Sequence, residues 1–162
     1  MAESGLPTSK TLKVYDSILD TIGNTPLVRL SNIGRNLTCQ LYAKIEFFNP
    51  GGSVKDRIGL NIIEEAEKSG RLKPGGTVVE STSGNTGLVL AIICTLRGYK
   101  SVFVIPDKMS QEKIQLLRAY GAKVIITPYI GGAGRPALLL QRCEQNCGGY
   151  SKRDISKPIS QS

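Results

Sequence analysis

Residues 49–70 read NPGGSVKDRIGLNIIEEAEKSG, a glycine-rich loop that leads into a helix, and this stretch decides the expected fold. Apolar residues recur in it at helical spacing: Val54, Ile58, Ile62 and Ala66. Ser53 is a plausible N-cap, and Asp56 stands three residues later, where a capping box places its acidic partner. Gly70 is expected to end the helix. The stretch therefore predicts an amphipathic helix that begins immediately after a turn.

C-terminal to this helix, strand and helix patterns alternate. Short apolar runs predict strands at 77–80, 102–105 and 124–126, and helical spacing predicts helices at 86–97 and 111–120. Gly98 and Gly121 follow the two helices, as C-terminal glycines commonly do. Strands joined through helices by short loops imply right-handed crossovers and a parallel sheet covered by helices. We expect an α/β fold with three layers, α/β/α.

The chain divides into three expected parts. Residues 1–17 form a flexible tail, and residues 18–128 form the folded domain. Within that domain a turn at 23–26 precedes a strand at 27–30, and a second early strand is expected at 40–47. Residues 129–162 are rich in glycine, serine and lysine, and we expect them to be loosely structured.

Composition excludes several classes of site. The chain has no histidine, which removes the commonest general base and histidine-ligated metals. The net charge is +8, but the basic residues are scattered and interleaved with acidic ones, so nucleic acid is not the expected partner. The longest apolar run, 88–96, is far shorter than a membrane span. Four irregularly spaced cysteines favour a reducing, cytoplasmic location over a disulfide framework.

The loop at 49–57 is the first candidate site. Lys55 is expected in the first helical turn, where the helix dipole disfavours a positive charge, and a free amine is what attacks an aldehyde. Gly51 and Gly52 allow the backbone to approach a ligand closely. The alternative is an ordinary helix start with Lys55 in solvent.

The loop STSGNTG at 81–87 is the second candidate site. Its hydroxyls, amide and glycines gather where a helix begins, which is a ready anion site. The residues concerned are Thr82, Ser83, Gly84, Asn85 and Thr86. The alternative is an elaborate helix cap, because serine, threonine and asparagine are favoured there in any case.

The motifs IGNTPLVRL, KIEFFNPGGSVKDR, TSGNTG and PDKMSQEK occur in one order between Ile18 and about Pro128. In this the chain resembles the cysteine synthase / cystathionine β-synthase family of fold-type-II pyridoxal-phosphate (PLP) enzymes, slightly more its cystathionine β-synthase branch. The resemblance implies a tryptophan-synthase-β-like fold of which the chain holds the N-terminal portion. Residues 129–162 resemble nothing in the family.

The resemblance also implies a role for each matched residue. Lys55 matches the lysine that holds PLP as a Schiff base and moves the substrate's α-proton. Asn85 matches the asparagine that hydrogen-bonds the cofactor's 3′-oxygen. The substrate carboxylate would be bound by the matching loop, comprising Thr82, Ser83, Gly84 and Thr86. The implied reaction replaces the β-substituent of a serine-type amino acid with a thiol or sulfide.

Three functions remain open on the sequence. The first is PLP-dependent β-replacement in sulfur amino-acid metabolism, with an amino acid and a thiol or sulfide as substrates. The second is a truncated, non-catalytic isoform that associates with a full-length relative or with itself. It is favoured for the chain as it stands, because the family's phosphate-binding glycine loop is not found. The third is a generic anion-binding α/β module.

Overall fold

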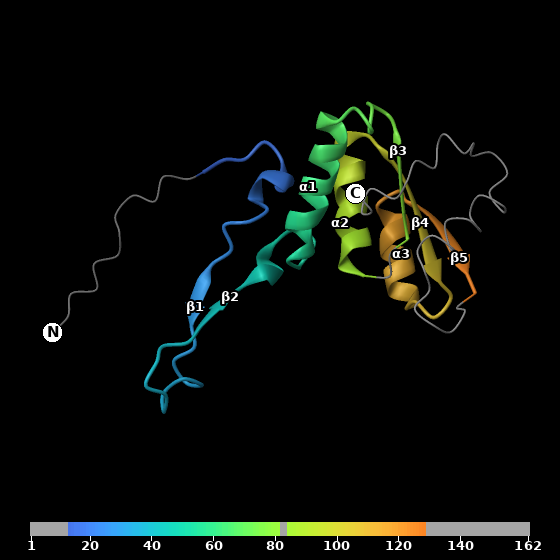
Figure 1. Ribbon diagram of the computed structural model, residues 1–162. Helices are drawn as coiled ribbons and strands as arrows, with labels where there is room; N and C mark the ends of the chain where they lie inside the picture. The colour runs from blue at the N-terminus through green and yellow to red at the C-terminus, as the bar shows by residue number, and fades with distance from the viewer. Residues whose placement is uncertain (1–12, 82–83, 129–162) are drawn as a thin grey trace.

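The computed structural model describes residues 13–81 and 84–128 (Figure 1). Three α-helices, two 3₁₀-helices and five strands occur within these ranges. In chain order they are η1 (Ile18–Thr21), β1 (Leu27–Arg29), β2 (Tyr42–Lys44), η2 (Glu46–Phe48), α1 (Lys55–Lys68), β3 (Thr77–Ser81), α2 (Asn85–Arg97), β4 (Lys100–Pro106), α3 (Gln111–Ala119) and β5 (Lys123–Thr127). The tail expected at 129–162 lies outside the described residues.

The central feature is a parallel sheet in the order β3-β4-β5. Its middle strand, β4, is buried on both faces: Phe103 and Ile105 face the helices in the main core, while Val102 and Val104 are also buried. A near-continuous apolar run of this kind is typical of a parallel strand that is covered on both sides. The predicted α/β class and parallel sheet are confirmed.

The described helices all lie on one side of the sheet. Strand order advances in one direction, so right-handed crossovers place α2 and α3 on the same face. The third helix, α1, packs against α2 rather than against the sheet (Figure 1). These residues therefore provide the sheet and one helical layer of the expected arrangement, with α1 stacked outside α2. None of the helices in the described ranges is long and apolar enough to cross a membrane.

Strands β1 and β2 form an antiparallel arm that extends away from the helices and the parallel sheet (Figure 1). The strand expected at 40–47 is shorter than predicted, because the chain turns at η2 after Lys44. Asn49 stabilises that turn, since its backbone N–H and its side-chain amide both donate to the Glu46 carbonyl, at 3.3 and 2.8 Å. Local side-chain bonding of this kind competes with continuation of a strand.

Candidate functional site

Lys55 is the first residue of α1, as the sequence predicts, and its side chain is exposed. Its backbone N–H donates to the Ser53 hydroxyl oxygen at 3.1 Å. The predicted N-cap was wrong: Val54, not Ser53, is the N-cap of α1, and it makes no side-chain cap bond. The Asp56 carboxylate nevertheless accepts from the Ser53 N–H at 3.3 Å. These bonds hold the backbone at Lys55 while its side chain remains exposed.

Asp56 also organises the glycines that precede Lys55. Its fully buried carboxylate accepts a short hydrogen bond from the Gly51 N–H as well as bonds from Ser53. A Cβ added at Gly51 would lie 2.8 Å from one Asp56 carboxylate oxygen, which leaves room only for glycine. Gly52 adopts φ +74°, a left-handed conformation that glycine reaches without strain. The conformation of the loop therefore requires glycine at both positions.

Asn49 holds the other side of this loop. It is 4% exposed, and its side-chain amide donates to the Ser53 carbonyl at 3.0 Å. Its side-chain oxygen accepts from the Gly23 N–H at 2.9 Å, which ties the turn at 23–26 to the loop. The sequence analysis did not single out this role for Asn49, because Gly23 is distant in sequence.

The second candidate loop lies where β3 gives way to α2, at the carboxyl edge of the parallel sheet. This is where open α/β folds bind ligands. Asn85 is the first residue of α2 and is exposed, and Thr86 is half-buried. A Cβ built on Gly84 would meet none of the described atoms within 4 Å, so the described residues leave room beside its Cα. Thr82 and Ser83 lie outside the described residues.

The two loops are brought together by the packing of α1 on α2. Gly59 lies against Val89 near the start of the helices, and Arg97 near the end of α2 bonds Glu64 and Glu67 of α1, at 3.4 and 2.7 Å. Contacts that advance in the same direction along both helices mean that the helices run parallel. Lys55 and Asn85 therefore stand at the same end of the pair, each at the N-terminus of its helix.

The first loop does not directly follow a strand of the parallel sheet, contrary to expectation. The strand before it, β2, belongs to the antiparallel arm, and η2 lies between β2 and the loop. Lys55 is therefore not carried by a strand of the parallel sheet. It is carried to the sheet's carboxyl edge by the contact between α1 and α2.

A pocket of about 110 Å³ opens beside this site. It is lined by Gly84, Asn85, Leu88, Met109, Lys113, Leu116 and Leu117. Its walls are mainly aliphatic, and an exposed lysine of α3, Lys113, contributes a charged group. An apolar recess with a few polar groups at one side is the usual form of a small-molecule site.

The donors present fit the cofactor predicted from the sequence. Lys55 offers a primary amine, which forms a Schiff base with an aldehyde. Asn85 offers an amide at the same end of the helix pair, and the neighbouring helix N-terminus favours anionic groups. The described residues also leave room beside the Cα of Gly84, next to Asn85.

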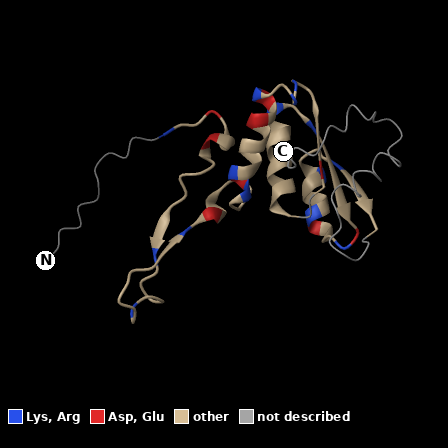
Figure 2. Ribbon diagram, viewed as in Figure 1, with Lys and Arg blue, Asp and Glu red and all other residues tan. Residues whose placement is uncertain are grey.

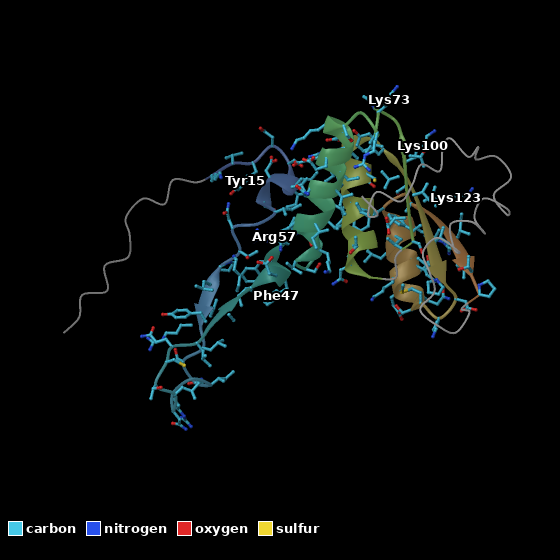
Figure 3. The ribbon with its side chains drawn as sticks, in the orientation of Figure 1. Tyr15, Phe47, Arg57, Lys73, Lys100 and Lys123 are labelled. Atoms are coloured by element: carbon cyan, nitrogen blue, oxygen red, sulfur yellow. The ribbon has the colours of Figure 1, made fainter. Side chains whose placement is uncertain are left out.

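A charged cluster fixes the base of the β1–β2 arm against α1. Arg57 donates to Glu46 at 2.9 and 3.2 Å, and Thr25 donates to the same carboxylate at 2.6 Å. Bonding by Arg57, followed by that of Thr25, lowers the pKa of Glu46 from 4.5 to about 2. Figure 3 shows Arg57 where the arm meets the helix, near Phe47. The sequence analysis did not identify this cluster.

This pKa predicts how stability depends on pH. Because the folded protein favours the Glu46 carboxylate, its stabilising effect is complete above pH 4.5 and is lost as the pH falls toward about 2. We expect the unfolding temperature of the unmodified chain to fall more steeply across this range than that of Glu46→Gln. Thermal unfolding followed by circular dichroism measures it. Glu65→Gln, which alters an exposed helix pair, should keep the parent slope; equal slopes in all three would contradict the assignment.

Basic and acidic residues alternate along the described elements rather than forming one basic stripe. Figure 2 shows both signs of charge along α1, where Lys68 pairs with Glu65 at 3.0 Å. Local ion pairs such as this one give α1 a surface of mixed charge.

Comparison with known proteins finds similarity to one family. A family model described as pyridoxal-phosphate dependent enzyme matches residues 18–156, so the expectation that residues 129–162 resemble nothing in the family is wrong for residues 129–156. The chain is 54% identical over 122 residues to cystathionine beta-synthase of Mus musculus, covering 74% of this chain and 22% of that protein. It is 53% identical over 116 residues to cysteine synthase of Staphylococcus aureus, covering 72% of this chain and 37% of that protein.

Solved structures are similar to the chain in both fold and sequence. A hydrogen sulfide-producing enzyme from Fusobacterium nucleatum matches with a TM-score of 0.76 and 46% identity, over 85% of this chain and 45% of that one. O-ureido-L-serine synthase matches with a TM-score of 0.72 and 44% identity, over 84% of this chain and 43% of that one. The chain thus spans less than half the length of these proteins.

Proposed function

The chain belongs to the family of pyridoxal-phosphate-dependent enzymes, and from that premise we propose that it carries the lysine half of a site for β-replacement on serine-type amino acids. The observation that carries the proposal is the parallel packing of α1 on α2, with Lys55 and Asn85 at the same end. The family's cofactor, PLP, is the one predicted from the sequence. The curated relatives include both a cysteine synthase and a cystathionine beta-synthase.

We assign the roles within the site as follows. Lys55 holds the cofactor's aldehyde carbon and afterwards moves the proton at the substrate's Cα. Asn85 donates a hydrogen bond to the cofactor ring's oxygen. The loop of Thr82, Ser83, Gly84 and Thr86, at the N-terminus of α2, binds the substrate carboxylate. When bound, PLP supplies the electron sink that this chemistry needs.

The pocket beside Gly84 supports a small amino acid and a thiol or sulfide as the substrates. Its aliphatic walls would exclude water from a bound methylene group, while the N-terminus of α2 favours a carboxylate. This separates the two ends of the substrate: the charged end on the loop and the reacting Cβ toward the recess.

The direct test is addition of PLP to the purified chain. We expect a visible absorbance band of a protein Schiff base, and after borohydride reduction a peptide that carries the cofactor on Lys55. Turnover of serine or O-acetylserine with sulfide then tests the reaction itself. A chain that forms the Schiff base without turnover would support a binding role. A chain that forms none would contradict the site assignment.

Filling the pocket tests where the amino acid binds. Leu88→Phe places a larger side chain in the recess and leaves Lys55 and Asn85 unsubstituted, and we expect the serine concentration needed for half the PLP absorbance change to rise roughly tenfold or more. Leu96→Phe, on an exposed position near the end of the same helix, is the matched control and should behave as the parent. An unchanged serine titration in Leu88→Phe would place the substrate elsewhere.

A second candidate function is association with a full-length relative, and a specific observation favours it. Large apolar side chains are exposed on and beside the arm: Leu27, Val28, Ile33, Leu37, Tyr42, Phe47 and Phe48. Ile33 is 74% exposed and Phe47 65%, and apolar surface gathered in this way commonly marks an interaction site.

Sedimentation of the purified chain, alone and mixed with a purified full-length cysteine synthase, tests this association. We expect a complex that Phe47→Ser weakens. Self-association of the chain alone would indicate a homodimer instead. Independent sedimentation of both proteins at all concentrations would exclude the proposal.

A further inference from the structure

Helices α1 and α2 pack tightly together at Gly59 and Val89. Gly59 is buried, and a methyl group added there would lie 2.5 Å from Val89 Cγ1. Ordinary contacts between carbon atoms lie at roughly 3.5–4 Å. The absence of a side chain at Gly59 therefore lets the two helix axes come about 1 Å closer than an alanine would permit.

This contact lies one helical turn from both candidate site residues. Gly59 follows Lys55 by four residues, and Val89 follows Asn85 by four residues. One turn is about 5.4 Å along the axis, so a shift at the contact reaches the helix ends almost undiminished.

The opposite end of the helix pair is clamped. Arg97 donates to Glu67 at 2.7 Å and to Glu64 at 3.4 Å, and the Tyr99 hydroxyl donates to Glu67 at 2.7 Å. Because these bonds hold this end, a side chain added at Gly59 would move the helices apart mainly at the other end, where Lys55 and Asn85 lie.

We propose that Gly59 is a positioning residue that sets the separation between Lys55 and Asn85. The proposal rests on the function proposed above, because the separation matters only if both residues hold one cofactor. Misplacement of a reacting group by about 1 Å costs on the order of 100-fold in catalysis. Gly59 thus acts through the spacing of two helices and touches neither cofactor nor substrate.

A double-mutant cycle tests the proposal. We expect Gly59→Ala to weaken Schiff-base formation with PLP by roughly tenfold or more, measured as the PLP concentration for half-maximal absorbance. Val89→Ala should remain within about twofold of the parent, and Gly59→Ala combined with Val89→Ala should recover, because the shortened partner makes room for the new methyl group. Gly98→Ala is the stability control, since its φ of +72° strains the far end of α2 and should lower the unfolding temperature alone.

A second readout requires no cofactor. A short bifunctional thiol reagent is used to join Lys55→Cys and Asn85→Cys in a background with Cys39, Cys143 and Cys147 replaced by serine. Cys94 can stay, because burial raises the pKa of its thiol to about 12. We expect the cross-linking rate to fall several-fold with Gly59→Ala and to recover in the double variant.

The two readouts separate the possible failures. If the parent chain forms no Schiff base but cross-linking follows the expected pattern, the spacing role stands and the proposed function fails. If Gly59→Ala leaves the cross-linking rate unchanged, the positioning role is overturned. It is also overturned if the parent forms the Schiff base and Gly59→Ala changes the cross-linking rate without changing the affinity for PLP. If Gly59→Ala does not fold, Val89→Leu crowds the same contact from α2 and is judged by the same outcomes.

Discussion

Lys55→Ala is expected to abolish the absorbance band that forms when PLP is added, because Lys55 is the lysine in the first turn of α1, at the same end as Asn85. The loss should be complete rather than partial, since a Schiff base needs the primary amine itself. Lys55→Arg keeps the positive charge and should lose the band equally. The measurement is absorbance together with peptide mass after borohydride reduction.

Lys68→Ala is the matched control for this prediction. Lys68 ends the same helix, is exposed and pairs with Glu65, so its loss should leave both the band and the labelled peptide unchanged. A band of parental size in Lys55→Ala, with the cofactor on another lysine, would overturn the assignment of Lys55.

Asp56→Ala should produce the largest loss of stability among variants at the site. It removes the acceptor of the Gly51 and Ser53 N–H groups and leaves them without that partner in a partly buried loop. Bonds to a charged group and the penalty for orphaned donors together predict a loss of about 2–4 kcal/mol in the free energy of unfolding. Urea unfolding measures the loss, and PLP binding should weaken in parallel because the loop positions Lys55.

Two comparisons define what this result means. Asp56→Asn retains one acceptor oxygen in the same volume and should lose clearly less than the alanine variant. Asp20→Ala removes the exposed carboxylate of the η1 capping box, whose Ser17 N–H bond is 3.0 Å, and should lose about 1 kcal/mol. An Asp56→Ala loss below about 0.5 kcal/mol would mean that Asn49 alone holds the loop.

The sequence predicted the helices best, because the bounds of a helix depend on residues close together in the chain. Apolar spacing and terminal glycines predicted α1 and α2 to within one or two residues, although the N-cap of α1 is Val54 and not the predicted Ser53. Each of these depends on residues within one or two helical turns of each other. Lys55 and Asn85 could therefore be named as helix-start residues before any tertiary contact was known.

What escaped prediction depends on contacts between distant residues. The strand expected at 40–47 is interrupted because Asn49 bonds back to Glu46, and no propensity encodes that bond. The parallel packing that unites the two loops depends on Gly59, which the helical pattern alone marks only as an unfavourable helix residue. A glycine inside an otherwise regular helix was the available signal for a close approach.

The unit α1–β3–α2 also bears on how the molecule reaches its native state. Only β3 separates the two helices in the chain, and the ion pair that fixes their far ends joins residues only 30 apart in sequence. Closing so short a loop costs little chain entropy, and pairings of low sequence separation form quickly. The half-site can therefore assemble early in folding, before β5 completes the sheet and independently of the antiparallel arm. In a chain that is still being synthesised, the Lys55 amine would then be in position before the rest of the fold has formed.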